Sequence, residues 1–183
     1  MDYIFKKMNW NKDWLIKTKI DIKPVRKIMD KIIGSKLDTT HKSTRGLNST
    51  QHDLIKDQSK FEDVTDLIKN ELCKLETRTF NLLSAWTVVG QENSYHMVHN
   101  HNQVAKDHVS TVLYLRMPKK KNIHQSGEFY YFLNDGNKIT YDRFLPLEGT
   151  LVIMPVHILH GAYPQAKGIR QTLNFDFEVK NDN

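Results

Sequence analysis

The sequence predicts an α+β fold that is mainly β, with N-terminal helices packed on one face of a sandwich or jelly roll. Apolar residues recur at helical spacing only within residues 1–79. From residue 80 to 180, short β-type runs follow one another between turn residues. No helical pattern separates these runs, which argues against parallel βαβ units. We therefore expect a single domain over 1–183, with a helical and loop part at 1–79 and a β-core at 80–180.

The composition is that of a globular protein. Charged residues make up 26% and hydrophobic residues 39% of the 183 residues. A net charge of +6 permits a nucleic-acid partner but does not require one, because scattered lysines usually serve solvation. The single Cys73 excludes an internal disulfide framework and a multi-cysteine zinc site. Its helical spacing beside Leu72 and Leu75 predicts a buried thiol.

No targeting or membrane segment is visible in the sequence. The first seven residues contain no long apolar core and no small-residue cleavage site. No apolar run approaches the length of a membrane span. We therefore expect a soluble, cytoplasmic protein with no membrane partner, and the sequence carries no indication of its oligomeric state.

Two amphipathic helices are expected in the first part of the chain. Pro24 can open the first helix, Gly34 ends it, and its apolar stripe consists of Val25, Ile28, Met29 and Ile32. The polar stretch 35–50 reads as a long loop. Ser59 to Glu62 forms a capping box before the second helix. The apolar face of that helix consists of Val64, Leu67, Ile68, Leu72 and Leu75.

Five strands are expected in the second part, at 82–89, 109–117, 128–133, 149–154 and 170–179. Gly90 breaks the first, a turn at 134–137 follows the third, and Pro155 stops the fourth. In the last strand, Leu173, Phe175 and Phe177 alternate with Arg170, Thr172 and Asn174. If the phenylalanines pack on the helices, the Arg170 face lines the interior of the β-core.

The nine histidines are unevenly distributed, and four of them lie between residues 96 and 108. On an extended segment, His99 and His101 point to the same face, so both imidazoles can reach one ion. His160 follows a strand that can place it opposite this pair. Three such ligands on facing strands hold a metal with open coordination positions. Taken alone, the pair is as well explained by chance in a histidine-rich chain.

A second feature supports a ligand pocket. Arg170 begins a strand ten residues after His160. A guanidinium buried on the interior face needs an anion, and a carboxylate is its natural bidentate partner. Tyr114 shares a face with Ser110 and Val112 and can add a phenol donor. The alternatives are an internal ion pair of Arg170 with Asp176 or Glu178, and an ordinary core position for Tyr114.

The segment from Trp86 to Phe177 resembles the iron(II)- and 2-oxoglutarate-dependent oxygenases, and especially a small bacterial and phage group of them. The resemblance rests on Trp86, His99-Asn100-His101, Ser110 to Leu115, Pro146 to Pro155, His160-Gly161 and Arg170 to Phe175, with a weaker match at Gly46 to Thr50. It implies a double-stranded β-helix (jelly roll) fold and a dioxygenase, a hydroxylase in the first instance, that uses Fe(II), 2-oxoglutarate and O2.

The resemblance also assigns residue roles. His99 and His160 would be iron ligands, and Arg170 and Tyr114 would bind the distal carboxylate of 2-oxoglutarate. Asn174 would line the cosubstrate pocket. The chain departs from the family at His101, where most members carry Asp or Glu. His101 is either the third ligand or a neighbour of the ligands, with iron held by two histidines or by a carboxylate such as Asp107. An imidazole there also argues against a halogenase.

Two rival functions remain open at this stage. A cupin-type metalloenzyme would use the three histidines without 2-oxoglutarate and would make no demand on Arg170 or Tyr114. A non-enzymatic jelly-roll module would need no iron. The lysine run 119–121 has no interleaved aromatic residues, which favours a protein side chain or a small molecule over nucleic acid as the substrate.

Overall fold

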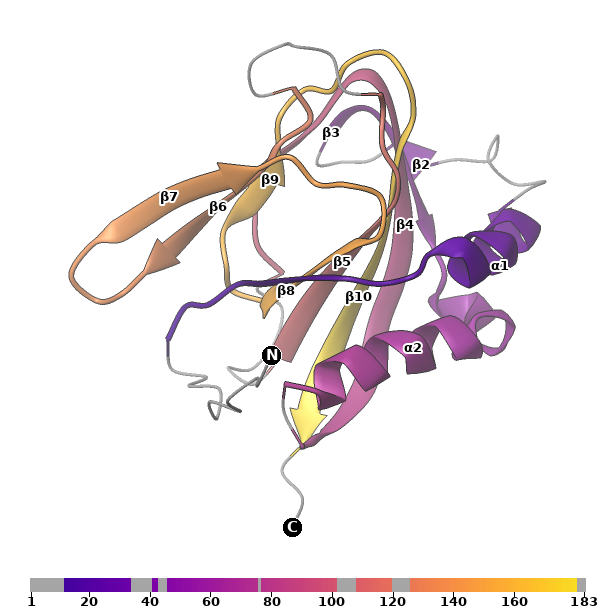
Figure 1. Cartoon of the computed structure of the whole chain (residues 1–183), viewed down its shortest axis with the longest axis horizontal. Helices are drawn as coiled ribbons and strands as arrows, with labels where there is room; N and C mark the ends of the chain where they lie inside the picture. Colours follow the sequence, from indigo (N-terminus) through magenta and orange to yellow (C-terminus); the bar gives the residue numbers. More distant parts are fainter. Residues whose placement is uncertain are drawn as a thin grey trace.

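A computed structural model describes residues 12–33, 41–42, 46–75, 77–101, 108–119 and 126–180. In chain order the elements are β1 (Ile16–Lys19), α1 (Lys23–Ile33), β2 (His41–Lys42), β3 (Gly46–Asp53), the 3-10 helix η1 (Ile55–Lys60), α2 (Glu62–Cys73), β4 (Thr79–His99), β5 (His108–Arg116), β6 (Phe129–Asn134), β7 (Ile139–Phe144), β8 (Thr150–Pro155), β9 (His160–Ala162) and β10 (Arg170–Lys180). Figure 1 shows both helices on one side of a curled sheet, with the β6–β7 hairpin projecting on the other side. The predicted α+β class, mainly β with N-terminal helices on one face, is confirmed. In the part of the chain that is described, no helix is long and apolar enough to cross a membrane.

The long strand β4 gives the sheet its curl. The sheet order is β1-β8-β5-β10-β4-β9-β6-β7, and β3 pairs with both β2 and β4. The first half of β4, from Thr79 to Gly90, pairs with β10. Its far end pairs instead with β9, through His96 and His99, with a register shift between them. One strand therefore connects the two sides of a jelly roll, which closes around an interior.

The jelly roll has two apolar cores. The first lies between the helices and the sheet, and the second lies inside the curl and includes Val112, Val152 and Met154. The predicted helix stripes are confirmed, because their members are buried in the first core or pack against it. Phe175 of β10 joins them, with its ring centroid 6.2 Å from that of Phe61. This contact fixes which face of β10 is turned toward α2.

Several boundaries differ from the prediction. β4 continues through Gly90, where a Cβ atom would lie 2.2 Å from Ser94 Oγ, so glycine serves a close approach and not a strand break. The expected loop 35–50 is wrong where β2 and β3 form. β1, β7 and β9 were also not predicted: β7 is an edge strand that contains no buried residue, and β9 has three residues, too few for a periodic pattern.

The start and the end of α2 also correct the prediction. The residue before the helix is Phe61, which makes no side-chain capping bond, whereas Ser59 lies within η1. The predicted capping box is therefore wrong, and the fully buried Phe61 anchors this end through the core. Cys73 at the other end is exposed, so the predicted buried thiol is also wrong. Gly34, the predicted end of α1, lies outside the described residues.

Candidate metal centre

Three histidines, one from β4, one from the segment just after it and one from β9, converge in the interior of the curl. His99 is the last residue of β4, His101 follows it by two residues, and His160 is the first residue of β9. His99 and His160 are paired across the two strands. The ring centroid of His99 lies 4.4 Å from that of His160 and 5.4 Å from that of His101. One ring nitrogen from each of the three lies within 4.8 Å of the other two, which is the arrangement that one metal ion needs.

Hydrogen bonds select the same tautomer for all three imidazoles. The Nδ1 atom of His99 lies 2.8 Å from the carbonyl oxygen of Met97, and that of His160 lies 2.9 Å from the carbonyl oxygen of Ile158. The Nδ1 atom of His101 lies 2.9 Å from Asp176 Oδ1. A carbonyl or carboxylate oxygen can only accept, so each Nδ1 carries the proton and donates. The ring nitrogen that can bind a metal is then Nε2 in each histidine.

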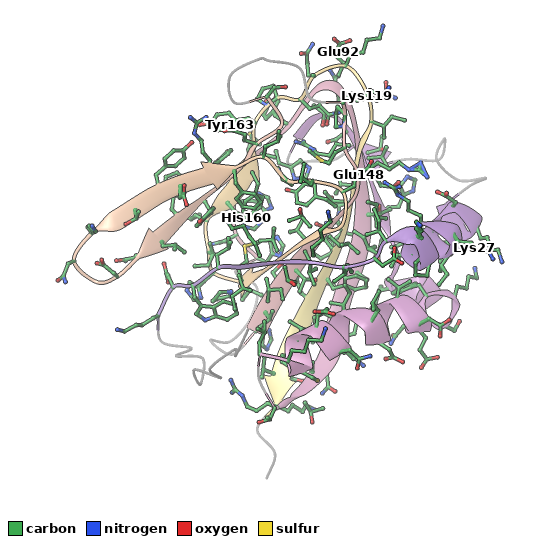
Figure 2. The ribbon with its side chains drawn as sticks, viewed as in Figure 1. Lys27, Glu92, Lys119, Glu148, His160 and Tyr163 are labelled. Atoms are coloured by element: carbon green, nitrogen blue, oxygen red, sulfur yellow. The ribbon has the colours of Figure 1, made fainter. Side chains whose placement is uncertain are left out.

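Burial keeps the central histidine neutral. His160 is 4% exposed, and Figure 2 shows its side chain in the crowded interior of the molecule. Burial holds the pKa of His160 well below its usual range, and the neighbouring His99 and His101 lower it further. A neutral imidazole is the form that binds a metal. Three imidazole donors, with the buried His160 neutral, therefore fit a divalent transition metal.

The histidines open onto a pocket between the two sides of the jelly roll. Its apolar walls include Val88, Val112, Phe129 and Ala162, and its polar walls include Tyr114, Arg170, Thr172 and Asn174. Thr172 of β10 is paired with Tyr114 of β5, so the polar side chains come from adjacent strands. The structure thus brings all six predicted site residues to one pocket, including the three that are not candidate metal ligands.

Arg170 lies in this pocket without a carboxylate partner among the described residues. Arg170 is 5% exposed, and the hydrogen bonds of its guanidinium to described residues are long ones, of 3.4 Å, to the carbonyl oxygens of Tyr163 and Ser94. The two carboxylates considered as partners are engaged elsewhere: Asp176 with His101, and Glu178 with Asn81. A buried cation in this state favours the binding of an anion.

Tyr114 lies close enough to Arg170 for the guanidinium charge to influence the ionisation of the phenol. Burial raises the pKa of Tyr114, and the positive charge of Arg170 opposes part of that rise. Burial also lowers the pKa of Arg170, which remains far above neutral for a guanidinium. At physiological pH the pocket therefore presents a protonated phenol and a guanidinium, both of which can donate hydrogen bonds.

Sequence reasoning missed several contributors to the site. Asp176 and Ser110 both contact the Nδ1 atom of His101, each at 2.9 Å. Trp86 packs on the same ring, with centroids 5.2 Å apart, and His96 lines the pocket. The alternation of β10 already places Asp176 on the face of Arg170 and could have revealed it. Asp107, considered as a possible ligand, lies outside the described residues.

Comparison with known proteins gives no match among protein-family models or curated protein sequences. Solved structures do match along most of the chain. A prolyl-4-hydroxylase from Pseudomonas putida is 16% identical with a TM-score of 0.67, over 91% of this chain and 93% of that one. HygX from Streptomyces hygroscopicus, with nickel and 2-oxoglutarate bound, is 13% identical with a TM-score of 0.69, over 92% and 84%. A viral collagen prolyl hydroxylase from Paramecium Bursaria Chlorella virus-1, in complex with 2OG, is 13% identical with a TM-score of 0.60, over 91% and 97%.

These identities are low, so the similarity concerns the fold. The matches with the two prolyl hydroxylases extend over at least 91% of each chain. An oxidoreductase of the 2OG-Fe(II) oxygenase family from Burkholderia pseudomallei is similar as well, with 12% identity and a TM-score of 0.59 over 78% of this chain and 71% of that one. The chain therefore has the jelly-roll fold that the solved 2-oxoglutarate- and iron-dependent oxygenases share.

Proposed function

We propose that the chain is an Fe(II)- and 2-oxoglutarate-dependent oxygenase that hydroxylates a protein side chain or a small molecule. The observation that carries this proposal is the buried Arg170, which has no carboxylate partner among the described residues and lies in the same pocket as three convergent imidazoles. A metalloenzyme that uses the histidines alone has no need of such a cation. The neighbours with this fold include both prolyl hydroxylases and HygX with hygromycin B bound, which supports either class of substrate.

His99, His101 and His160 would hold the metal through Nε2 on one side of the ion. The iron and 2-oxoglutarate, when bound, supply the activation of O2 and the oxidation of a C–H bond. The protein contributes orientation: hydrogen bonds to Nδ1 fix each ring before the metal arrives. A metal held by these residues would face the pocket that Tyr114, Arg170 and Asn174 line.

Arg170 and Tyr114 would bind the distal carboxylate of 2-oxoglutarate. The planar guanidinium can form a two-bond pair with a carboxylate, and the protonated phenol can donate a further hydrogen bond. Asn174 donates from Nδ2 to the carbonyl oxygen of Trp86 and to Thr172 Oγ1, both at 3.2 Å, and thereby holds the wall of this pocket in place. The apolar walls exclude water and strengthen the ionic contact.

Calorimetry with anaerobic Mn(II) or Fe(II) and 2-oxoglutarate tests the proposal. The parent protein should bind about one equivalent of metal and then 2-oxoglutarate, and His160→Ala should lose the metal. Arg170→Ala should raise the Kd for 2-oxoglutarate roughly 30-fold or more, because removing one partner of a desolvated charge pair costs about 2–5 kcal/mol. Its metal content should not change, and Arg170→Lys should recover part of the loss.

Arg143→Ala is the matched control, because Arg143 is an arginine of β7 that pairs with Glu128 outside the pocket. It should bind 2-oxoglutarate like the parent. A parent protein that binds metal but has no affinity for 2-oxoglutarate would favour a cupin-type enzyme. A parent that binds neither would favour a non-enzymatic module.

A further inference from the structure

The polar face of β10 extends beyond the residues assigned to the cosubstrate. Arg170, Thr172 and Asn174 are followed at the same spacing by Asp176. Asp176 Oδ1 lies 2.9 Å from His101 Nδ1, with side-chain exposures of 16% and 6%. Asp176 thus faces the candidate metal centre from outside the set of possible ligands, and it contacts one of the three imidazoles.

The three imidazoles differ, among the described residues, in the group that lies next to Nδ1. His99 and His160 donate from Nδ1 to backbone carbonyl oxygens, whereas His101 donates to a carboxylate. A carboxylate that accepts from Nδ1–H fixes the ring orientation and makes Nε2 a stronger donor to a metal. The same contact places a negative charge one imidazole away from the ion.

We propose that Asp176 is a positioning residue that acts through His101, aiming its Nε2 at the metal and supplying negative charge to a site that has three neutral ligands. This inference rests on the metal site of the proposed function and makes His101 a true ligand. It also gives the chain a substitute for a directly coordinating carboxylate. The negative charge lies on Asp176 of β10 and acts on the metal through the His101 ring.

The surroundings of Asp176 fix its contact with His101. Ser84 Oγ donates to Asp176 Oδ2 at 3.1 Å, so both carboxylate oxygens are engaged. The pairing of β10 with β4 shifts register between Asp176 and Phe177. Trp86 also packs against the His101 ring, with centroids 5.2 Å apart. The carboxylate and the imidazole are therefore fixed by two strands and an indole.

The test is a double-mutant cycle on Co(II) or Mn(II) affinity, measured against a chromophoric chelator without oxygen or 2-oxoglutarate. Asp176→Asn keeps the size of the side chain and removes its charge. It should weaken metal binding roughly 10–100-fold in the parent. In a His101→Ala background the same change should have an effect within about twofold, because the route to the metal is gone. The visible spectrum of the saturated Co(II) protein should also differ between Asp176→Asn and the parent.

Two further variants keep the test decisive. Glu178→Gln changes the next carboxylate of β10, which bonds to Asn81, and should bind metal like the parent. Ser84→Ala leaves the Asp176 charge in place but removes its Oδ2 bond, and should weaken metal binding by about two- to fivefold, again only when His101 is present. This variant replaces Asp176→Asn if that protein does not fold.

The inference is overturned if Asp176→Asn binds Co(II) as tightly as the parent, or weakens binding equally in the His101→Ala background. A parent that binds metal and shows the predicted cycle but does not bind 2-oxoglutarate would overturn the proposed function and leave the inference standing. A parent with no metal affinity would overturn both.

Discussion

The two faces of β10 are buried to nearly the same depth but are built from opposite chemistry. On one face, Leu173, Phe175 and Phe177 are 0% exposed and belong to the apolar core that includes α2. On the other face, Arg170 and Asn174 are each 5% exposed and line the pocket with Thr172. Depth alone therefore does not separate the structural face from the functional one. The difference lies in the kind of contact, close packing or polar partners, that each face needs when it is buried.

The apolar face needs only close packing, whereas the polar face needs partners. Asn174 and Asp176 have them within the protein, through Trp86, Thr172, Ser84 and His101. Arg170 has only long bonds to backbone carbonyl oxygens among the described residues. A buried charge with weak partners lowers the stability of a protein, so its presence indicates a role in binding.

The largest change in the free energy of unfolding is expected for a substitution on the apolar face of β10. Phe175→Ala should lower the free energy of unfolding by about 3–5 kcal/mol, because it removes a ring from a filled core. Urea denaturation of the metal-free protein measures this, with Thr172→Ala as the partner variant on the polar face. If both variants lost equal stability, the two faces would not differ as described.

A smaller change in the free energy of unfolding, an increase and not a decrease, is expected for a substitution on the polar face of β10. Arg170→Met should raise the free energy of unfolding by about 1–3 kcal/mol when 2-oxoglutarate is absent, because an apolar chain replaces a buried, poorly paired charge. Added 2-oxoglutarate with metal should stabilise the parent and not the variant. Thermal unfolding with and without the ligand provides the measurement. A variant less stable than the parent in the absence of ligand would make Arg170 a structural residue.

The smallest change in the free energy of unfolding is expected for a residue that lies on neither face of β10. Arg116 at the end of β5 pairs with Asp30 of α1 at 2.6 Å, with side-chain exposures of 36% and 57%. Arg116→Ala should change the free energy of unfolding by about 0–1 kcal/mol, because solvent and salt screen exposed pairs. Denaturation at low and high ionic strength checks this. A loss comparable with that of Phe175→Ala would show that α1 depends on this ion pair.

The sequence predicted the elements that are rich in buried apolar residues. Both helices form near their expected positions because one buried face imposes a helical period, and β5, β8 and β10 do so because they are apolar runs or alternations bounded by turn residues. It did not predict β3, whose residues are mostly polar, or β7, which lies exposed at the edge of the sheet. Such strands are held by their pairing with β4 and β6, and pairing leaves little trace in local composition.

The sequence predicted which residues belong to the candidate site better than it predicted the contacts between them. The spacing of His99 and His101 and the alternation after Arg170 both anticipated which side chains meet in the pocket. Asp176 was considered as a partner of Arg170, but it contacts His101. Alternation assigns a residue to a face, whereas its partner depends on which strand lies alongside and in which register.

The sequence by itself determined the periodic features of this protein: the helix stripes, the two faces of β10, and the presence of histidine, arginine and tyrosine at positions that can face inward. Only the tertiary structure decided that His160 meets His99 and that Asp176 meets His101. Both contacts depend on β4, which pairs with β10 along its first half and with β9 at its end. Local sequence sets the direction of each side chain, but the pairing of distant strands sets the distances between them.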